Sequence, residues 1–196
     1  MLTNLSLTPS RPISDANALA VHFTRNDALI VNMLINNYRV SKILVDMGRS
    51  VNILYGGALD MMEDTPKIAR TMISPQTQSY LYGFDGNETY SAGTVTLPVR
   101  ADPYVIMKFY VVDVESPHNA ILRRPWLHIM KVIPSTYHHL VRYPTLTGTT
   151  DIRGDQAMTR TISAIAGKKF GLRPKNAKTV SDKHLPAGEK RKRVAT

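Results

Sequence analysis

An acidic residue at the end of an apolar strand is the sharpest chemical signal in this sequence. Gly48 stands two positions after Asp46 in the run Ile43-Leu44-Val45-Asp46-Met47-Gly48-Arg49-Ser50. A carboxylate at the end of a buried strand is costly unless it is hydrogen-bonded or paired. The glycine lets the chain turn sharply and bring backbone N–H groups to that carboxylate. The pattern fits a candidate site for carboxylate chemistry, and it also fits a solvated aspartate in an ordinary turn.

The other polar residues give no pattern of metal ligands or nucleophiles. The chain has no cysteine, which excludes disulfides, thiolate zinc sites and cysteine nucleophiles. His138 and His139 are adjacent in a strand-like run, so they should point to opposite faces and cannot easily bind one metal. Asp60, Glu63 and Asp64 form an acidic cluster near a helix end, which is typical of a solvated face. We therefore expect no metal and no cofactor.

Short strands at close spacing must position Asp46. The segments 28–36 and 38–46 flank the turn signal Asn36-Asn37, which predicts a β-hairpin. Three glycines punctuate a tyrosine-rich stretch at 80–93 and predict a second hairpin. Further strands are expected at 51–55, 94–99, 104–112, 119–122, 138–143 and 149–153, and helices at 56–62 and 125–130. The spacing predicts a mostly β, small closed fold with one or two short helices.

Length and composition predict one folded domain between two ends. The chain has 196 residues, of which 43% are hydrophobic and 20% charged, and these values exclude a fully disordered chain. No apolar run approaches the roughly 18 residues of a membrane span, and the N-terminus lacks a secretory signal pattern. We predict a flexible leader at 1–23, the domain at 24–158, and a basic tail without fixed structure at 159–196.

The positive charge is concentrated at the C-terminal end. Residues 1–166 carry 15 Lys/Arg against 13 Asp/Glu, whereas residues 167–196 carry 10 against 2. The run Lys190-Arg191-Lys192-Arg193 is typical of a nuclear address or of a non-specific nucleic-acid contact, and also of a solvated tail. An intracellular or nuclear location and nucleic-acid binding are therefore expectations about the tail alone.

Several motifs occur in an order that is more specific than any one of them. After the Asp-x-Gly turn come Leu81-Tyr82-Gly83-Phe84, the run 93–99, and Asn119-Ala120-Ile121-Leu122-x-Arg124-Pro125-Trp126-Leu127. Two further runs follow at 132–138 and 152–156. Over about residues 24–158, this order resembles the retropepsin-like aspartic protease region of gypsy-type LTR retrotransposon polyproteins, as found in plants.

The resemblance implies a fold and a chemistry. It implies a closed retropepsin-like barrel with a flap hairpin at about 80–93, which would carry Tyr82, Gly83 and Phe84 at the cleft. It implies one catalytic aspartate per chain, carried over to Asp46, so that a working site needs a homodimer. In such a dyad the two carboxylates share a proton, and together they cleave a peptide or polyprotein substrate.

Three residues depart from the family pattern, and all three oppose catalysis. Met47 replaces a hydroxyl residue whose hydrogen bonds tie the two active-site loops together. Arg49 replaces a small residue, and we expect its guanidinium to pair with Asp46 and hold it ionised. Arg123 replaces a glycine that packs near the same loop, a place that does not readily accept a large side chain.

Three functional hypotheses follow from the sequence. The first is a degenerate, retrotransposon-derived aspartic protease domain with little or no activity, in which the loop 46–50 is altered. The second is an active homodimeric endopeptidase that processes a polyprotein through Asp46. The third, from another class, is a β-fold interaction module whose basic tail contacts nucleic acid.

Overall fold

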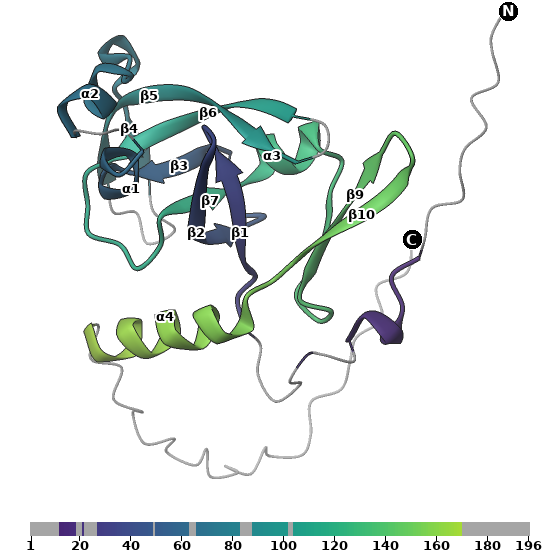
Figure 1. Ribbon diagram of the computed structural model, residues 1–196. Coiled ribbons are helices and arrows are strands. Elements are labelled where there is room, and N and C mark those ends of the chain that lie inside the picture. The colour runs from purple at the N-terminus through teal and green to yellow at the C-terminus, as the bar shows by residue number, and fades with distance from the viewer. Residues whose placement is uncertain are drawn as a thin grey trace, which may run out of the picture.

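The computed structural model describes residues 12–18, 21, 27–48, 50–62, 66–82, 88–101 and 104–169. These residues form two β-sheets with short helices at their edges (Figure 1). The basic run at 190–193, the proposed nuclear address, lies outside the described residues. The helices of the described part are too short or too polar to span a lipid bilayer.

The main sheet has seven strands in the order β1-β2-β7-β3-β6-β5-β4. The strands are β1 (Ile30–Ile35), β2 (Tyr38–Val45), β3 (Asn52–Tyr55), β4 (Tyr80–Tyr82), β5 (Glu88–Arg100), β6 (Tyr104–Val112) and β7 (Ala120–Leu122). An additional antiparallel pairing of β1 with β5 makes the strand order return on itself. The mostly β fold predicted from the sequence is confirmed.

The β1–β2 hairpin forms where the sequence places it. Asn36 and Asn37 connect the strands with φ angles of 49° and 66°. Two successive residues with positive φ are typical of a two-residue turn that matches the twist of the flanking strands, and asparagine tolerates this conformation better than most residues. The hairpin positions Asp46, because β2 ends at the residue before it.

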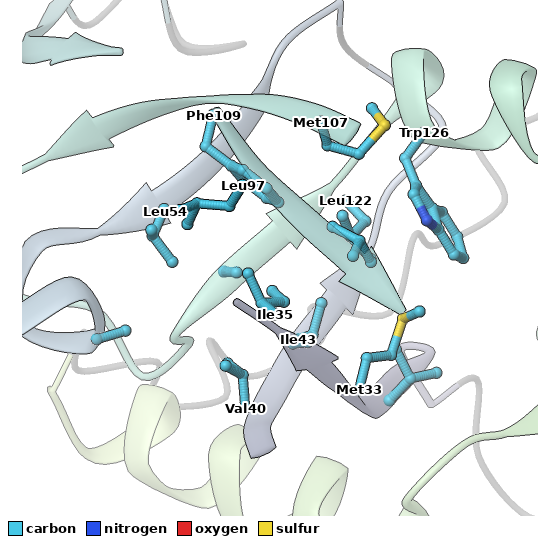
Figure 2. Packing of buried hydrophobic residues seen from close by; sticks show 14 of the residues in the cluster. Met33, Ile35, Val40, Ile43, Leu54, Leu97, Met107, Phe109, Leu122 and Trp126 are labelled. Carbon is cyan, nitrogen blue, oxygen red and sulfur yellow. The ribbon is translucent and has the colours of Figure 1, made fainter. Parts of the chain in front are cut away.

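The interior of the main sheet is filled by apolar side chains from every part of the domain. Figure 2 shows Ile35 and Ile43 from the first hairpin facing Leu97 and Phe109 from β5 and β6. Trp126 is fully buried and comes from α3 (Arg124–Ile129), which begins with Pro125 in its first turn, as the sequence predicts. Burial of these large side chains stabilises the sheet by the hydrophobic effect.

A second sheet follows α3, and this differs from the expectation for the last strands. The sequence predicts that 138–143 and 149–153 close the main fold. Instead β9 (Leu140–Thr145) pairs only with β8 (Ile133–Ser135) and β10 (Gly148–Arg153). The chain leaves β7 through α3 and turns at Lys131, whose φ is 51°, so the following strands form a separate antiparallel arm (Figure 1).

The helices are more extensive than expected. α1 (Gly56–Asp60) lies at a predicted position, whereas α2 (Pro66–Thr71) and α4 (Gln156–Lys169) were not expected. Two 3-10 helices, η1 (Asp15–Ala18) and η2 (Pro75–Thr77), complete the described elements. η1 lies in the expected leader and buries Asn17 and Ala18.

The expected boundary at residue 158 falls inside α4, so residues 159–169 are helical. The helix is held to the chain entering β1, because Thr159 Oγ1 donates to the carbonyl oxygen of Ala28 at 3.1 Å and Ile162 is buried. The sequence gave a weak signal here, since the apolar side chains of this helix are few.

Candidate active site

Strand β7 holds Asp46 in place beside the chain that follows it. β2 and β7 run parallel, with Val45 opposite Leu122. The N–H of Asp46 donates to the carbonyl oxygen of Leu122 at 3.0 Å. The residues directly after both strands, Asp46 and Arg123, are therefore brought together at one edge of the sheet.

The turn after β2 presents an N–H group to the aspartate, as the sequence predicts. The N–H of Gly48 donates to Asp46 Oδ1 at 2.9 Å. A Cβ atom at position 48 would lie 3.2 Å from the same oxygen, which is tighter than most contacts of a Cβ. The glycine thus allows the backbone to approach the carboxylate closely.

A guanidinium occupies the second oxygen of the same carboxylate. Arg123 Nε donates to Asp46 Oδ2 at 3.1 Å, and the two side chains are 12% and 33% exposed. Charge-assisted hydrogen bonds of this kind are stronger than neutral ones. Asp46 therefore has a donor on each of its two oxygens, both from its own chain.

Asn52 fixes the backbone from which Arg123 projects, and the sequence analysis missed it. Asn52 is 1% exposed; its Oδ1 accepts from the N–H of Arg123 at 2.8 Å, and its Nδ2 donates to the carbonyl oxygen of Lys108 at 3.2 Å. This residue joins β3, β6 and the start of α3 behind the aspartate. A buried amide at the start of a predicted strand was the available signal.

The predicted partner of Asp46 was Arg49, and this residue lies outside the described part of the chain. The structure assigns an Asp46 partner that the sequence did not name, Arg123. The backbone of Arg123 has φ −126° and ψ −165°, an extended conformation open to any residue. Arginine is accommodated at this position because its side chain turns toward the carboxylate.

The two other predicted residues of the loop lie at the surface. Met47 is 61% exposed and Ser50 is exposed as well. Their side chains are thus open to solvent in the single chain. The thioether of Met47 is at best a weak hydrogen-bond acceptor, so it cannot replace a hydroxyl group.

A hairpin of β4 and β5 occupies the predicted flap segment. Tyr80, Leu81 and Tyr82 pair with Tyr90, Thr89 and Glu88. Gly83 and Phe84, predicted at its tip, lie outside the described residues. At its base Gly93 has φ +138°, and a Cβ there would overlap the carbonyl oxygen of Ser74. Only glycine fits this bend without strain.

A small apolar cluster connects the hairpin with the strands around the aspartate. Its buried members are Ile53, Val112 and Ile121, and Leu44, Tyr55 and Leu81 pack against it. Ile53 follows Asn52 directly, and Ile121 lies two residues before Arg123. The cluster therefore begins one residue from the groups that hold Asp46.

At the far end of β3 a hollow of about 450 Å³ opens between α1 and residues 113–119. Tyr55, Met61, Asp113 and His118 contribute to its lining. Burial lowers the pKa of His118, because the charged imidazolium is poorly solvated there. The sequence analysis set His118 aside as a scattered histidine.

The acidic cluster predicted to be a solvated face is in part an ion-pair site. Arg70 Nε donates to Asp60 Oδ1 at 2.6 Å, and Arg70 also contacts Asp113 at 2.6 Å. The hydrogen bond from Arg70 lowers the pKa of Asp60, and the pKa of Arg70 is raised in turn. Glu63 and Asp64 lie outside the described residues.

The two adjacent histidines do not lie in a strand, contrary to expectation. β9 begins at Leu140, and His139 ends the preceding turn with φ 50°. His138 Nδ1 lies 2.8 Å from Ser135 Oγ, whereas His139 is 4% exposed. In the part of the chain that is described, no three metal-binding side chains gather.

Neither the protein-family models nor the curated proteins give a match to this sequence. Solved structures do. The retroviral protease-like domain of Ddi1 from Leishmania major is 14% identical, with a TM-score of 0.51 over 66% of this chain and 94% of that one. A retropepsin-like aspartic protease from Rickettsia conorii is 17% identical, with a TM-score of 0.36 over 56% and 82%. The chain therefore has a retropepsin-like fold.

Proposed function

We propose that this chain is a retropepsin-like aspartic protease domain whose catalytic function is suppressed by its own Arg123. The observation that carries the proposal is the 3.1 Å hydrogen bond from Arg123 Nε to Asp46 Oδ2. The order of the sequence motifs supports an origin in a retrotransposon polyprotein. The retropepsin-like fold supports the role of Asp46 as the former catalytic residue.

The suppression follows from the chemistry of a carboxylate dyad. Two carboxylates at a symmetric site work because they share one proton, and one activates water while the other donates. A guanidinium bound to Asp46 favours the ionised form and opposes proton sharing. It also occupies the side of the carboxylate from which a second aspartate or a water molecule would approach.

A working homodimeric endopeptidase is the second candidate. It is favoured by the Gly48 N–H that still donates to Asp46 at 2.9 Å and by the hairpin at the flap position. For this function the Asp46 of a second copy must displace Arg123 from the carboxylate. The exchange costs about 1–3 kcal/mol at the group that loses its partner, so a tight dimer would be needed.

A cleavage assay separates the two candidates. The chain, Arg123→Gly, and the triple variant Met47→Thr, Arg49→Ser, Arg123→Gly are incubated with a peptide library at about pH 5, where a dyad can hold one shared proton. Arg124→Gln is the matched control, because it removes the neighbouring arginine. We expect cleavage only from variants that lack Arg123, and Asp46→Asn in those variants should abolish it.

Two results would count against the proposal. Cleavage by the unaltered chain that is lost in Asp46→Asn would establish the active homodimer instead. A triple variant that dimerises, as measured by light scattering, and still does not cleave would show that Arg123 is not what suppresses activity.

A further inference from the structure

Two arginines project from the outer face of the main sheet on either side of one residue. Leu34 of β1 is opposite Arg39 on β2 and opposite Arg100 on β5. Met33 and Ile35 are buried, so Leu34 points away from the core, and its two partners share its face. Strands two positions apart lie about 10 Å from one another, a span that two arginine side chains can cover.

The second sheet turns this face into a hollow. A cavity of about 240 Å³ is lined by both arginines together with Asn32, Leu34, Tyr143 of β9 and Ile152 of β10. The main sheet supplies the cationic wall, and the arm of β9 and β10 supplies an apolar one. The hollow lies apart from Asp46, at the other side of the β1–β2 hairpin.

Neither arginine has a carboxylate partner among the described residues. Arg100 lies over the ring of Tyr104 at 5.8 Å, which leaves its N–H groups available at the edge. The carboxylates of the adjoining arm are already engaged: Asp151 with Arg142, and Asp155 with the side chain of Asn32 and the N–H of Met158. The cationic wall is therefore not neutralised by the protein around it.

We propose that Arg39 and Arg100 form a binding site for an oxyanion, a phosphate or carboxylate group of a small ligand. The planar guanidinium presents paired donors that match both groups. Tyr143 and Ile152 provide an apolar surface for the remainder of the ligand. The cavity is smaller than the roughly 300–1,000 Å³ typical of drug-sized ligands, so the ligand is small or only its anionic end enters.

Titration of the full chain with two probes tests the site. Inorganic phosphate and, separately, succinate are added at constant ionic strength, and the Nε–Hε resonances of the arginines are followed by NMR. We expect saturable shifts for Arg39 and Arg100. Arg39→Gln and Arg100→Gln should each weaken binding about tenfold or more. Arg160→Gln, an exposed arginine on α4, should bind as the unaltered chain does.

The outcomes identify the ligand or remove the site. Tighter saturation by phosphate defines a phosphate site, and tighter saturation by succinate defines a carboxylate site. Linear shifts with both probes, or equal weakening by Arg160→Gln, would overturn the proposal. If a glutamine variant does not fold, Arg39→Lys and Arg100→Lys keep the charge, and binding at full strength by both lysine variants would also overturn it.

Discussion

Arg142 of β9 and Asp151 of β10 stand directly opposite one another and are joined by two parallel hydrogen bonds. Arg142 Nε donates to Asp151 Oδ1 at 2.6 Å, and a terminal guanidinium nitrogen donates to Oδ2 at 2.7 Å. The arginine side chain is 5% exposed and that of the aspartate 21%. The pairing raises the pKa of Arg142, so the guanidinium stays charged although it is buried.

Asp151→Asn should loosen the second sheet more than the main one. The change leaves a buried guanidinium without its anion, which costs about 3–5 kcal/mol in a fully buried pair. Because Asp151 is partly exposed, we expect about 2–3 kcal/mol. Hydrogen exchange of the β9 and β10 amides measures the effect. Equal protection in Asp151→Asn and in the neighbouring control Thr150→Asn would contradict it.

Asp46 and Arg123 should be energetically coupled in the single chain. A double-mutant cycle of Asp46→Asn and Arg123→Gln, followed by urea unfolding, measures the coupling. We expect about 1 kcal/mol, because the pair is hydrogen-bonded but Asp46 remains one-third exposed. The same cycle with Arg124→Gln should give a coupling near zero. Equal couplings for the two arginines would mean that the contact is not specific.

The stability of the domain should fall with acidification in two separate pH windows. The pKa of His118 is lowered in the folded state, so the unfolded chain takes up a proton first as the pH falls below about 6.5. The pKa of Asp60 is also lowered, and its contribution is present above about pH 4 and lost below it.

Each window can be removed by one variant. His118→Gln should flatten the decline that begins near pH 6.5, and Asp60→Asn should flatten the one below about pH 4. Urea midpoints measured from about pH 3 to 8 give the two profiles. Retention of the first decline in His118→Gln would assign it to another histidine.

Gly93→Ala should destabilise the base of the β4–β5 hairpin. The new Cβ would overlap the carbonyl oxygen of Ser74 at a φ of +138°, which is unfavourable for alanine. We expect a loss of at least about 2 kcal/mol in thermal or urea unfolding. Gly57→Ala is the control, because nothing lies within 4 Å of a Cβ at that position. Similar stability of the two variants would refute the strain.

Local signals in the sequence predicted the fold well where a few neighbouring residues decide the structure. The turn at Asn36-Asn37 and the helix that begins at Pro125 depend on backbone preferences within four residues, and both lie where expected. The second sheet was missed because nothing within β9 specifies which strand it pairs with. Its isolation comes from the path of α3 and from the Arg142–Asp151 pair.

The candidate site was predicted in part, for a related reason. Asp46 and Gly48 are near neighbours, so their hydrogen bond was expected from the sequence. Arg123 lies 77 residues from Asp46. Only the parallel pairing of β2 with β7 brings it there, whereas Arg49 was the nearest cation along the chain. Asn52 was missed because its role depends on both Arg123 and β6.

The pairing of β1 with β5 and of β2 with β7 sets a time order on a chain made from its N-terminus. The first hairpin is complete once residue 45 is synthesised, but its partners Val99 and Arg100, and then Leu122, follow much later. Long-range strand pairing of this kind is slow and leaves strand edges open in the meantime. On the ribosome, Asp46 therefore waits without Arg123, and a nascent chain that stops before residue 120 carries the aspartate without the residue that restrains it.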